Sequence, residues 1–329
     1  MDKFNVLGLD LGYVQLKAVG NNWSDICPSI VKRRSEVIVS GIEDSEGFLI
    51  TGQDGTWNVG SKGSYDFKAE RLTSTSDVPK LLTMLGLYHE ATSTNIVDLI
   101  VSGLPVDDFK LLDFKNEFAE RLKGIFSFGF GSQQKYMSVG NAIALPQSAG
   151  AFFDYILTED AEDNTANIEL ASHDVLVLDI GGKSFDGCIM EGAKFSQDSF
   201  TIWQGVWKVH SELRKLLMRK YRYNMPPYKL DAVLRTGIAE IGANMEDVHE
   251  LCKIAVETVF PELRDELSLY VPDFRRFASV LLCGGGSYVY QDYIRALAGI
   301  PVHQLPNAEF ANASGYRKYG LLKMKEGLL

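Results

Sequence analysis

The 329-residue chain lacks the features that mark a membrane protein, a disulfide-rich secreted protein or a basic nucleic-acid-binding protein. No apolar run approaches the roughly 18 residues of a membrane-spanning helix, so we expect no membrane partner. The four cysteines are widely spaced without a C-x-x-C pair, which favours reduced thiols in a cytoplasmic protein over disulfides or cysteine-bound metal. The net charge is −10, so we expect no direct binding to nucleic acid.

The composition is that of an ordinary globular protein. Hydrophobic residues make up 46% of the chain and charged residues 23%, and the length suits two domains, each with its own core. The opening MDKFNVLGLD enters an apolar strand at once, without a basic segment and a long apolar core. We therefore expect no secretion signal.

One stretch combines a buried strand, a carboxylate and a tight glycine bend. Val175–Cys188 reads VLVLDIGGKSFDGC, in which four apolar residues lead to Asp179 and then to Gly181 and Gly182. The apolar run predicts a strand buried on both faces, and glycines let a backbone approach an anion such as phosphate closely. By itself, a glycine hairpin with a nearby aspartate is more often a plain turn.

A second copy of this pattern changes the interpretation. Phe4–Val19 reads FNVLGLDLGYVQLKAV, again an apolar strand, an aspartate (Asp10), a glycine two residues later (Gly12) and a return strand. The two copies lie about one domain apart, which indicates two related domains. A third apolar strand ends in glycines at Val280–Ser287, VLLCGGGS. The three bends together fit one nucleotide clamped between two domains.

These motifs resemble those of the actin/Hsp70/sugar-kinase superfamily. Asp10–Lys17 resembles its first phosphate loop, Asp179–Asp186 its second, and Leu282–Ser287 its adenosine motif. Leu145–Gly150 and Phe310–Gly315 resemble the two connecting segments. The closing run AEFANASGYRKYG is most similar to ParM-type plasmid-segregation actins and archaeal actin-like proteins. The motifs span residues 10 to 316, and their order is more specific than any one of them.

The resemblance implies an α/β protein made of two RNase H-like domains, the actin-like fold, with a nucleotide cleft between them. It places domain I at residues 1–158, with a small insertion subdomain at about 28–92 and a completing C-terminal segment at about 306–329. Domain II is then 159–305. A short C-terminal helix carrying Leu321, Leu322, Met324 and Leu328 is predicted to dock on domain I, rather than on a membrane.

The resemblance also assigns site residues. Asp10, Asp179 and Gln147 are the catalytic candidates: the two aspartates hold Mg²⁺ through water, and Gln147 orients the attacking water. The nucleotide-binding candidates are Gly12, Tyr13, Val14, Lys17, Gly181, Gly182, Lys183, Ser184, Gly205, Gly284, Gly285, Gly286 and Ser287. Lys17 also has the alternative of a solvated strand lysine, and Gln147 that of a helix cap. Lys183 departs from the residues that the family carries in this loop.

The implied function is a polymerising nucleoside triphosphatase for ATP or GTP. Its partners are then other copies of itself and a DNA-binding adaptor through which filaments move plasmid DNA. The alternatives are a small-molecule kinase of the sugar-kinase type, which needs a second substrate cleft, and a non-motile actin-like scaffold. An Hsp70-like chaperone would need a peptide-binding domain after Tyr316.

Several local patterns outside the motifs carry their own predictions. A helix from about Gly205 to Tyr221 has a basic second half, Arg214, Lys215, Arg219, Lys220 and Arg222, which favours a solvated or subunit-contact face over nucleic-acid binding. Short strands are expected at Glu36–Ser40 and Tyr136–Val139. Asn244 is expected to cap a helix, and Pro261 to begin a new turn.

Overall fold

The chain divides into two compact units, and the computed structural model describes residues 4–34, 47–61 and 77–328 of them. The first unit is Met1–Ala171 together with Phe310–Leu329, and the second is Ser172–Glu309. The division expected from the sequence, at 158/159 and 305/306, stays a prediction of domain boundaries. The strand expected at Glu36–Ser40 lies outside the described residues. None of the helices in the described ranges is long and apolar enough to cross a membrane.

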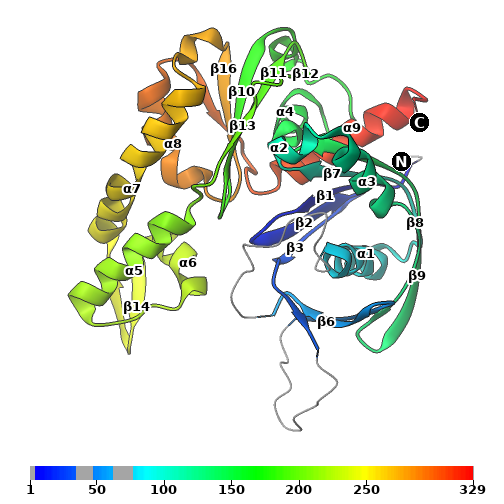
Figure 1. Ribbon diagram of the computed structural model, residues 1–329, viewed down its shortest axis with the longest axis horizontal. Coiled ribbons are helices and arrows are strands. Elements are labelled where there is room, and N and C mark those ends of the chain that lie inside the picture. Colours follow the sequence, from blue (N-terminus) through cyan, green and yellow to red (C-terminus); the bar gives the residue numbers. More distant parts are fainter. Residues whose placement is uncertain (1–3, 35–46, 62–76, 329) are drawn as a thin grey trace. The chain divides into compact units, whose positions relative to one another are not determined.

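The first unit is built on one large sheet (Figure 1). Among the described residues it has nine strands in the order β3-β2-β1-β7-β9-β8-β5-β6-β4. Strands β1, β7 and β9 are parallel, whereas β2 runs antiparallel to both of its neighbours, β1 and β3. The strands are β1 (Val6–Leu11), β2 (Gln15–Gly20), β3 (Trp23–Pro28), β4 (Val31–Arg33), β5 (Phe48–Gly52), β6 (Gly55–Val59), β7 (Ile96–Leu104), β8 (Gly124–Phe130) and β9 (Gln133–Pro146).

Helices cover both faces of the central strands in this unit. Helix α1 (Asp77–Thr92) is buried over almost its whole circumference, because the sheet curves around it (Figure 1). Trp57 is 4% exposed and belongs to the same core, so its role is packing. The remaining elements of the unit are α2 (Val106–Phe109), α3 (Leu112–Leu122), α4 (Ala149–Ile156), α9 (Ala311–Lys325) and the 3₁₀ turn η1 (Ile168–Ser172).

The last helix completes the first unit. Helix α9 packs on α4 and on β1 and β7, so the predicted docking of the C-terminal helix on domain I is confirmed. It begins earlier than expected, at Ala311. A Cβ atom on Gly315 would lie 1.7 Å from the carbonyl oxygen of Gly150, so the two backbones touch where α4 and α9 meet. The side chain of Asn312 then accepts a hydrogen bond from the N–H of Ala151 at 3.1 Å.

The second unit repeats the strand topology of the first. Among the described residues its main sheet has the order β12-β11-β10-β16-β17, with β13 also paired to β11. The hairpin β10–β11 is antiparallel and β10, β16 and β17 are parallel, as β1–β2 and β1, β7 and β9 are in the first unit. The strands are β10 (Asp174–Ile180), β11 (Phe185–Glu191), β12 (Lys194–Phe195), β13 (Phe200–Ile202), β14 (Ile238–Ile241), β15 (Asn244–Asp247), β16 (Ser279–Cys283) and β17 (Val302–Gln304). The repeat confirms two related α/β domains.

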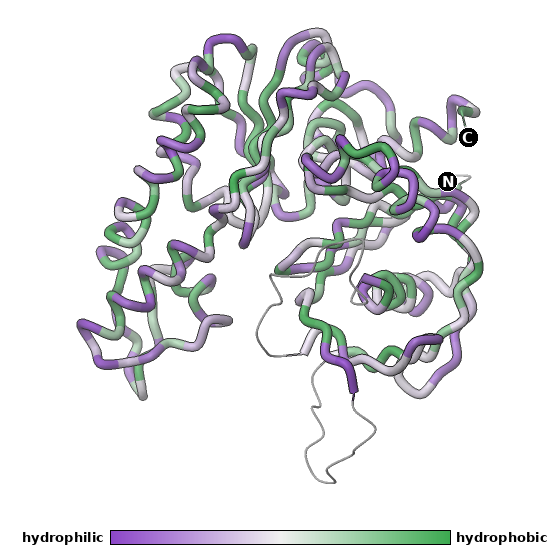
Figure 2. The backbone as a smooth tube through the Cα atoms, viewed as in Figure 1, coloured by the Kyte–Doolittle hydropathy of each residue, from purple (hydrophilic) through white to green (hydrophobic). Residues whose placement is uncertain are grey.

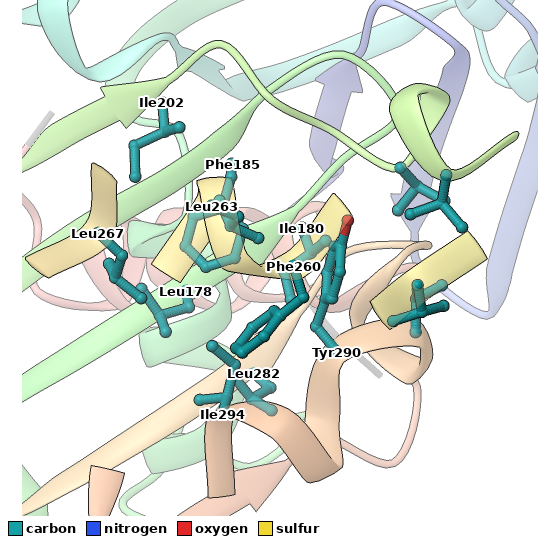
Figure 3. Close-up of a cluster of buried hydrophobic side chains, with 14 of the residues drawn as sticks. Leu178, Ile180, Phe185, Ile202, Phe260, Leu263, Leu267, Leu282, Tyr290 and Ile294 are labelled. Carbon is teal, nitrogen blue, oxygen red and sulfur yellow. The ribbon is translucent and has the colours of Figure 1, made fainter. Parts of the chain in front are cut away.

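The core of the second unit lies between this sheet and its helices. Leu178, Ile180 and Leu282 from the parallel strands meet Phe260, Leu263 and Ile294 from the helices (Figure 3). Hydrophobic and hydrophilic residues alternate along α5 and α7, so each helix buries one side (Figure 2). The helical elements are α5 (Trp207–Tyr221), η2 (Pro227–Lys229), α6 (Leu230–Thr236), α7 (His249–Tyr270), η3 (Phe274–Arg276) and α8 (Ser287–Ala298).

Two local predictions in this unit are wrong. Asn244 does not cap a helix, because it begins β15, which pairs with β14 in a hairpin, and the helix starts at His249. Pro261 does not begin a new turn, because α7 runs through it. The proline is tolerated because Pro261 and Glu257, four residues earlier, are both exposed, so water can satisfy the carbonyl group that the proline ring leaves without a donor.

Candidate functional site

The first hairpin places a carboxylate directly opposite a lysine. Asp10 on β1 is the cross-strand partner of Lys17 on β2, and Lys17 Nζ lies 3.5 Å from Asp10 Oδ2. The two side chains are 8% and 9% exposed, so Lys17 is buried in an ion pair and is not a solvated strand lysine. Attraction between such a pair is strong because little water screens it. The hairpin therefore holds one carboxylate, which suits a metal ion, beside one cation, which suits a phosphate.

The bend of this hairpin is tied to the chain that follows β3. The carbonyl group of Val14 accepts a hydrogen bond from the N–H of Ser29 at 2.9 Å. Tyr13 and Val14 are half-buried. Within the described part of the chain, the N–H groups of Gly12 and Val14 have no hydrogen-bond acceptor. These two N–H groups are the ones in the bend that can bind an anion.

Gln147 lies at the same edge of the sheet as Asp10. Strands β1, β7 and β9 are parallel, and Asp10 and Gln147 come at or just after the carboxyl ends of β1 and β9. Ligands bind at this edge in open α/β sheets. The N–H of Gln147 donates to the carbonyl oxygen of Leu104 at 2.6 Å. Gln147 is half-buried and only Ser148 separates it from α4, so its side chain is not confined within a helix.

Ser148, next to Gln147, has an unusual backbone conformation. Its φ is +77°, in the left-handed region that non-glycine residues rarely adopt, and the residue is fully buried. Among the described residues its Oγ has no hydrogen-bond partner. Such strain persists only where the surrounding structure enforces it. The packing of α4 against α9 therefore sets the direction in which the chain leaves Gln147.

The second hairpin has the same geometry with a different partner. Asp179 on β10 lies opposite Asp186 on β11 and is 4% exposed. Asp186 accepts hydrogen bonds from Ser184 Oγ at 2.8 Å and from Thr201 Oγ1 at 2.5 Å. These two donors satisfy the buried Asp186 carboxylate. The hydroxyl group of Ser184 is thus committed to Asp186, which leaves its main-chain N–H for a ligand.

The bend of the second hairpin is anchored to the start of α5. Carbonyl groups of Gly181, Gly182 and Lys183 accept hydrogen bonds of 2.8 to 3.1 Å from the N–H groups of Val206, Trp207 and Gly205. A Cβ atom on Gly205 would lie 2.3 Å from the oxygen of Gly182, so this contact requires glycine. Within the described ranges, the N–H groups of Gly182 and Ser184 have no acceptor. The carbonyl groups of the bend are thus hydrogen-bonded within the protein, and the N–H groups of Gly182 and Ser184 remain available to bind an anion.

Lys183 does not extend freely into solvent. Its Nζ lies 4.9 Å from the centre of the Trp203 ring, a cation–π distance. Trp203 is 50% exposed, so the pair lies at the surface beside the bend. This contact gives Lys183 a position close to the second hairpin, where its charge favours a bound anion.

The glycine turn after β16 packs directly against Asp179. The pairing of β10 with β16 places Asp179 beside Cys283, immediately before the turn. Gly284 has a φ of +85°, and a Cβ atom there would lie 2.2 Å from Asp179 Oδ1 and 2.5 Å from the Ile180 oxygen. The N–H of Gly286 donates to the same Ile180 oxygen at 2.8 Å. Ser287 Oγ accepts from Gln304 Nε2 at 2.6 Å. The structure thus brings Asp179, the second bend and the glycine turn together.

A cluster that the sequence analysis missed surrounds the carbonyl group of Gly285. Arg235 on α6 donates to this oxygen through Nη2 at 2.6 Å and lies 4.1 Å above the ring of Tyr288. Asp231 accepts from Arg235 Nε at 2.8 Å and from the Tyr288 hydroxyl at 3.1 Å. Burial, together with the charge of Asp231, raises the pKa of Tyr288, so the hydroxyl stays protonated. The only local signal was an Asp–Arg pair four residues apart on a helix.

The fourth member of this cluster is a histidine. His210 Nε2 lies 3.8 Å from Asp231 Oδ1. Burial lowers the pKa of His210, although the charge of Asp231 opposes this shift. At neutral pH the ring is therefore neutral and does not compete with Arg235 as a charged partner of Asp231.

The carboxylates fit Mg²⁺ bound mainly by phosphate and water. No group of three or more histidine, cysteine or acidic side chains that could enclose a metal ion exists within the described ranges. Mg²⁺ does not require one, because it keeps several waters and is commonly held by one or two carboxylates and the phosphates of its nucleotide. Asp10 and Asp179 each stand beside a bend whose N–H groups suit phosphate oxygens.

Comparisons with known proteins agree with this arrangement of motifs. The family described as "Actin like proteins N terminal domain" matches residues 8–150, and "Archaeal actin homologue MreB-like, C-terminal" matches residues 177–296. Together these matches cover most of the chain, in the order expected for the two domains. The chain belongs to the actin-like superfamily. No curated protein sequence matches it.

Solved structures show the same fold across the whole chain. Alp7A, an actin-like protein, superposes with a TM-score of 0.83 at 14% identity, covering 98% of this chain and 97% of its own. Ta0583, an archaeal actin homolog crystallised with ADP, gives 0.76 at 19% identity, covering 96% and 99%. A ParM from a 15-stranded filament of Clostridium botulinum gives 0.72 at 21% identity, covering 96% and 99%. At these identities the likeness concerns the fold.

Proposed function

We propose that this protein binds and hydrolyses ATP or GTP with Mg²⁺ and that nucleotide binding drives its assembly into filaments. The observation that carries the proposal is the repeated hairpin, with a buried aspartate two residues before a glycine bend in each unit. One related structure contains ADP and another is a ParM filament, which supports the same two properties here.

The proposed roles of the residues follow from their positions. The N–H groups of Gly12, Val14, Gly182 and Ser184 bind phosphate oxygens, and Lys17 and Lys183 add positive charge near the two bends. Asp10 and Asp179 hold Mg²⁺ through water. When bound, this ion neutralises charge on the β- and γ-phosphates. Gly205 and the turn Gly284–Ser287, which includes Gly285 and Gly286, give the nucleotide a close-packed backbone surface.

Gln147 is the residue that we propose to orient the attacking water. An amide can accept and donate hydrogen bonds but is not a strong base, so its contribution is alignment. Its position at the carboxyl edge of β9, in the same sheet as Asp10, supports this role. The strained backbone at Ser148 supports it as well, because the chain direction after Gln147 is set by packing.

The filament is proposed to form in the cytoplasm and to segregate plasmid DNA. All four cysteines are free and buried, as suits a reducing compartment. Because the chain carries a net charge of −10, contact with DNA is proposed to go through a separate DNA-binding adaptor.

Sedimentation and phosphate release test this function together. Wild-type protein should pellet with ATP or GTP and release phosphate. Asp179→Asn should lower the turnover about 100-fold, a loss typical when an electrostatic group is removed from a catalytic site. Asp292→Asn makes the same charge change at a side chain that is 80% exposed on α8, and its turnover should equal that of wild type.

Three results would count against the proposal. Wild-type protein that neither pellets nor hydrolyses nucleotide would overturn it. Phosphoryl transfer to a sugar by unpolymerised protein would favour the kinase alternative. If the Asp179→Asn variant assembles and hydrolyses nucleotide at the wild-type rate, Asp179 takes no part in hydrolysis.

A further inference from the structure

The outward face of α5 and the residue that follows the helix carry two arginines, Arg219 and Arg222, that form no ion pair with the described residues. Val209, Leu213 and Leu217 face the core, and the opposite side of the helix is exposed. At its C-terminal end Arg219, Lys220 and Arg222 are all exposed and form no ion pair within the described residues. Lys220, however, lies seven residues after Leu213 on the core-facing side of the helix, where its charge acts on Asp247. We call Arg214, Lys215, Arg219 and Arg222 the cationic face.

This face is also hollowed and partly apolar. A hollow of about 400 Å³ is lined by Ser211, Arg214, Lys215, Met218, Arg219 and Asn224. Met218 is 43% exposed in it, and Trp207 is 43% exposed about three turns earlier on the same side of the helix. Arg214 Nε is bound to Asn224 Oδ1 at 2.7 Å, which holds the rim of the hollow in place.

These features favour a protein partner over a nucleic acid. Tryptophan, methionine and arginine are the residues enriched at protein interfaces, and tryptophan and arginine contribute most to their affinity. A nucleic acid would have to approach a protein whose net charge is −10. The same net charge makes copies of this chain repel one another, so assembly requires a local region of opposite sign.

A complementary acidic segment lies in the first unit. Asp160, Glu162 and Asp163 follow α4 and are exposed, and their carboxylates form no ion pair within the described residues. Lys325 Nζ donates to the carbonyl oxygen of Asp160 at 2.6 Å, which leaves the carboxylate of Asp160 without an ion pair. Their neighbour Glu159 differs, because it lies 3.1 Å from Lys318 and is already neutralised. The carboxylates of this segment are thus opposite in sign to Arg219 and Arg222 of the cationic face.

We propose that the cationic face of α5 docks on the acidic segment Asp160–Asp163 of a second copy of this chain. The inference rests on the proposed self-assembly and names its contact. The carboxylates meet Arg219 and Arg222, and Met218 and Trp207 supply the apolar part of the interface. A head-to-tail contact of this kind, between different surfaces, propagates into a filament instead of closing into a dimer.

Charge reversal tests the contact. Arg219→Glu with Arg222→Glu should raise the critical concentration for nucleotide-dependent assembly about tenfold, because like charges then face each other. Asp160→Lys with Glu162→Lys should do the same. The chain that carries all four changes regains opposite charges and should assemble within about threefold of wild type. Lys253→Glu with Arg264→Glu on α7 is the matched control and should leave assembly unchanged.

Binding of a fluorescent nucleotide by the monomeric variants reports that they are folded. Unchanged assembly of either reversed variant would overturn the contact and leave the proposed function intact. Failure of the fourfold variant to recover would show that the acidic segment is not the partner. Loss of duplex DNA binding in Arg219→Glu/Arg222→Glu, with assembly intact, would make the face a nucleic-acid surface. Wild-type protein that never assembles would overturn both the proposed function and this contact.

Discussion

Replacing Gly284 by alanine tests whether the glycine turn positions Asp179. Gly284 has a φ of +85°, and an added Cβ atom would lie 2.2 Å from Asp179 Oδ1 and 2.5 Å from the Ile180 oxygen. Neither atom can move freely, because Asp179 is 4% exposed and Ile180 accepts a hydrogen bond from Gly286. The substitution should therefore displace the carboxylate as well as strain the backbone.

The magnitude follows from two separate costs. A non-glycine residue in the left-handed region costs about 1–2 kcal/mol. Forcing an extra carbon into a packed site costs about 1–3 kcal/mol more. Gly299, at the end of α8 in the same unit, has a φ of +64° with open space around its Cβ position, so Gly299→Ala carries the first cost alone. The free energy of unfolding should thus fall by about 1–3 kcal/mol more in Gly284→Ala than in Gly299→Ala.

Urea unfolding followed by circular dichroism measures this difference, and titration with a fluorescent nucleotide measures the site. We expect Gly284→Ala to lose nucleotide affinity and Gly299→Ala to keep it. Equal loss of stability in the two variants, or full nucleotide affinity in Gly284→Ala, would refute the close packing of the turn against Asp179.

Three further predictions concern buried polar groups. Thr201→Val should destabilise the protein by about 1–3 kcal/mol because the Asp186 carboxylate loses a hydroxyl donor, whereas Thr201→Ser keeps that donor and should not. Equal urea midpoints for the two variants would contradict this role of the hydroxyl group. Burial lowers the pKa of His210 below 6.5, so unfolding releases the ring to bind a proton and stability should fall as the pH drops below 6.5. Thermal melts between pH 5 and 8 should show less of this fall in His210→Gln, and identical pH profiles would refute it. Burial raises the pKa of Cys27 and Cys188 to about 12, and all four cysteines are buried. Iodoacetamide at pH 8 should therefore label no cysteine in the native protein and all four in urea, as counted by mass spectrometry. Rapid labelling of the native protein would show that these sites open to solvent.

The two hairpins were predictable because their signals are local. An apolar run, an aspartate and a glycine within a few residues define the strand, its end and the bend, and both occur in the structure at Val6–Gly20 and Asp174–Glu191. The order of the motifs also predicted the fold. Their joint use of one nucleotide stays a prediction, since it concerns both units.

The features that the sequence did not reveal depend on distant partners. Tyr136–Val139 read as a short strand, whereas β9 extends to Pro146 because it pairs along the whole of β7. Asn244 has the chemistry of a helix cap but lies in a hairpin with Ile241 opposite it. Arg235 reaches Gly285, fifty residues later in the chain, and no local pattern specifies that contact.

The touching backbones of α4 and α9 bear on the order in which the protein takes shape during synthesis. The first unit needs Ala311–Lys325 to cover α4 and the central strands, yet these residues are translated after the whole of the second unit. The unit that leaves the ribosome first is therefore completed last. Its apolar surface stays exposed until the final helix is translated, whereas the second unit folds from an uninterrupted segment. A ribosome that stalls before Ala311 would hold one complete unit and one with its core still open to chaperones.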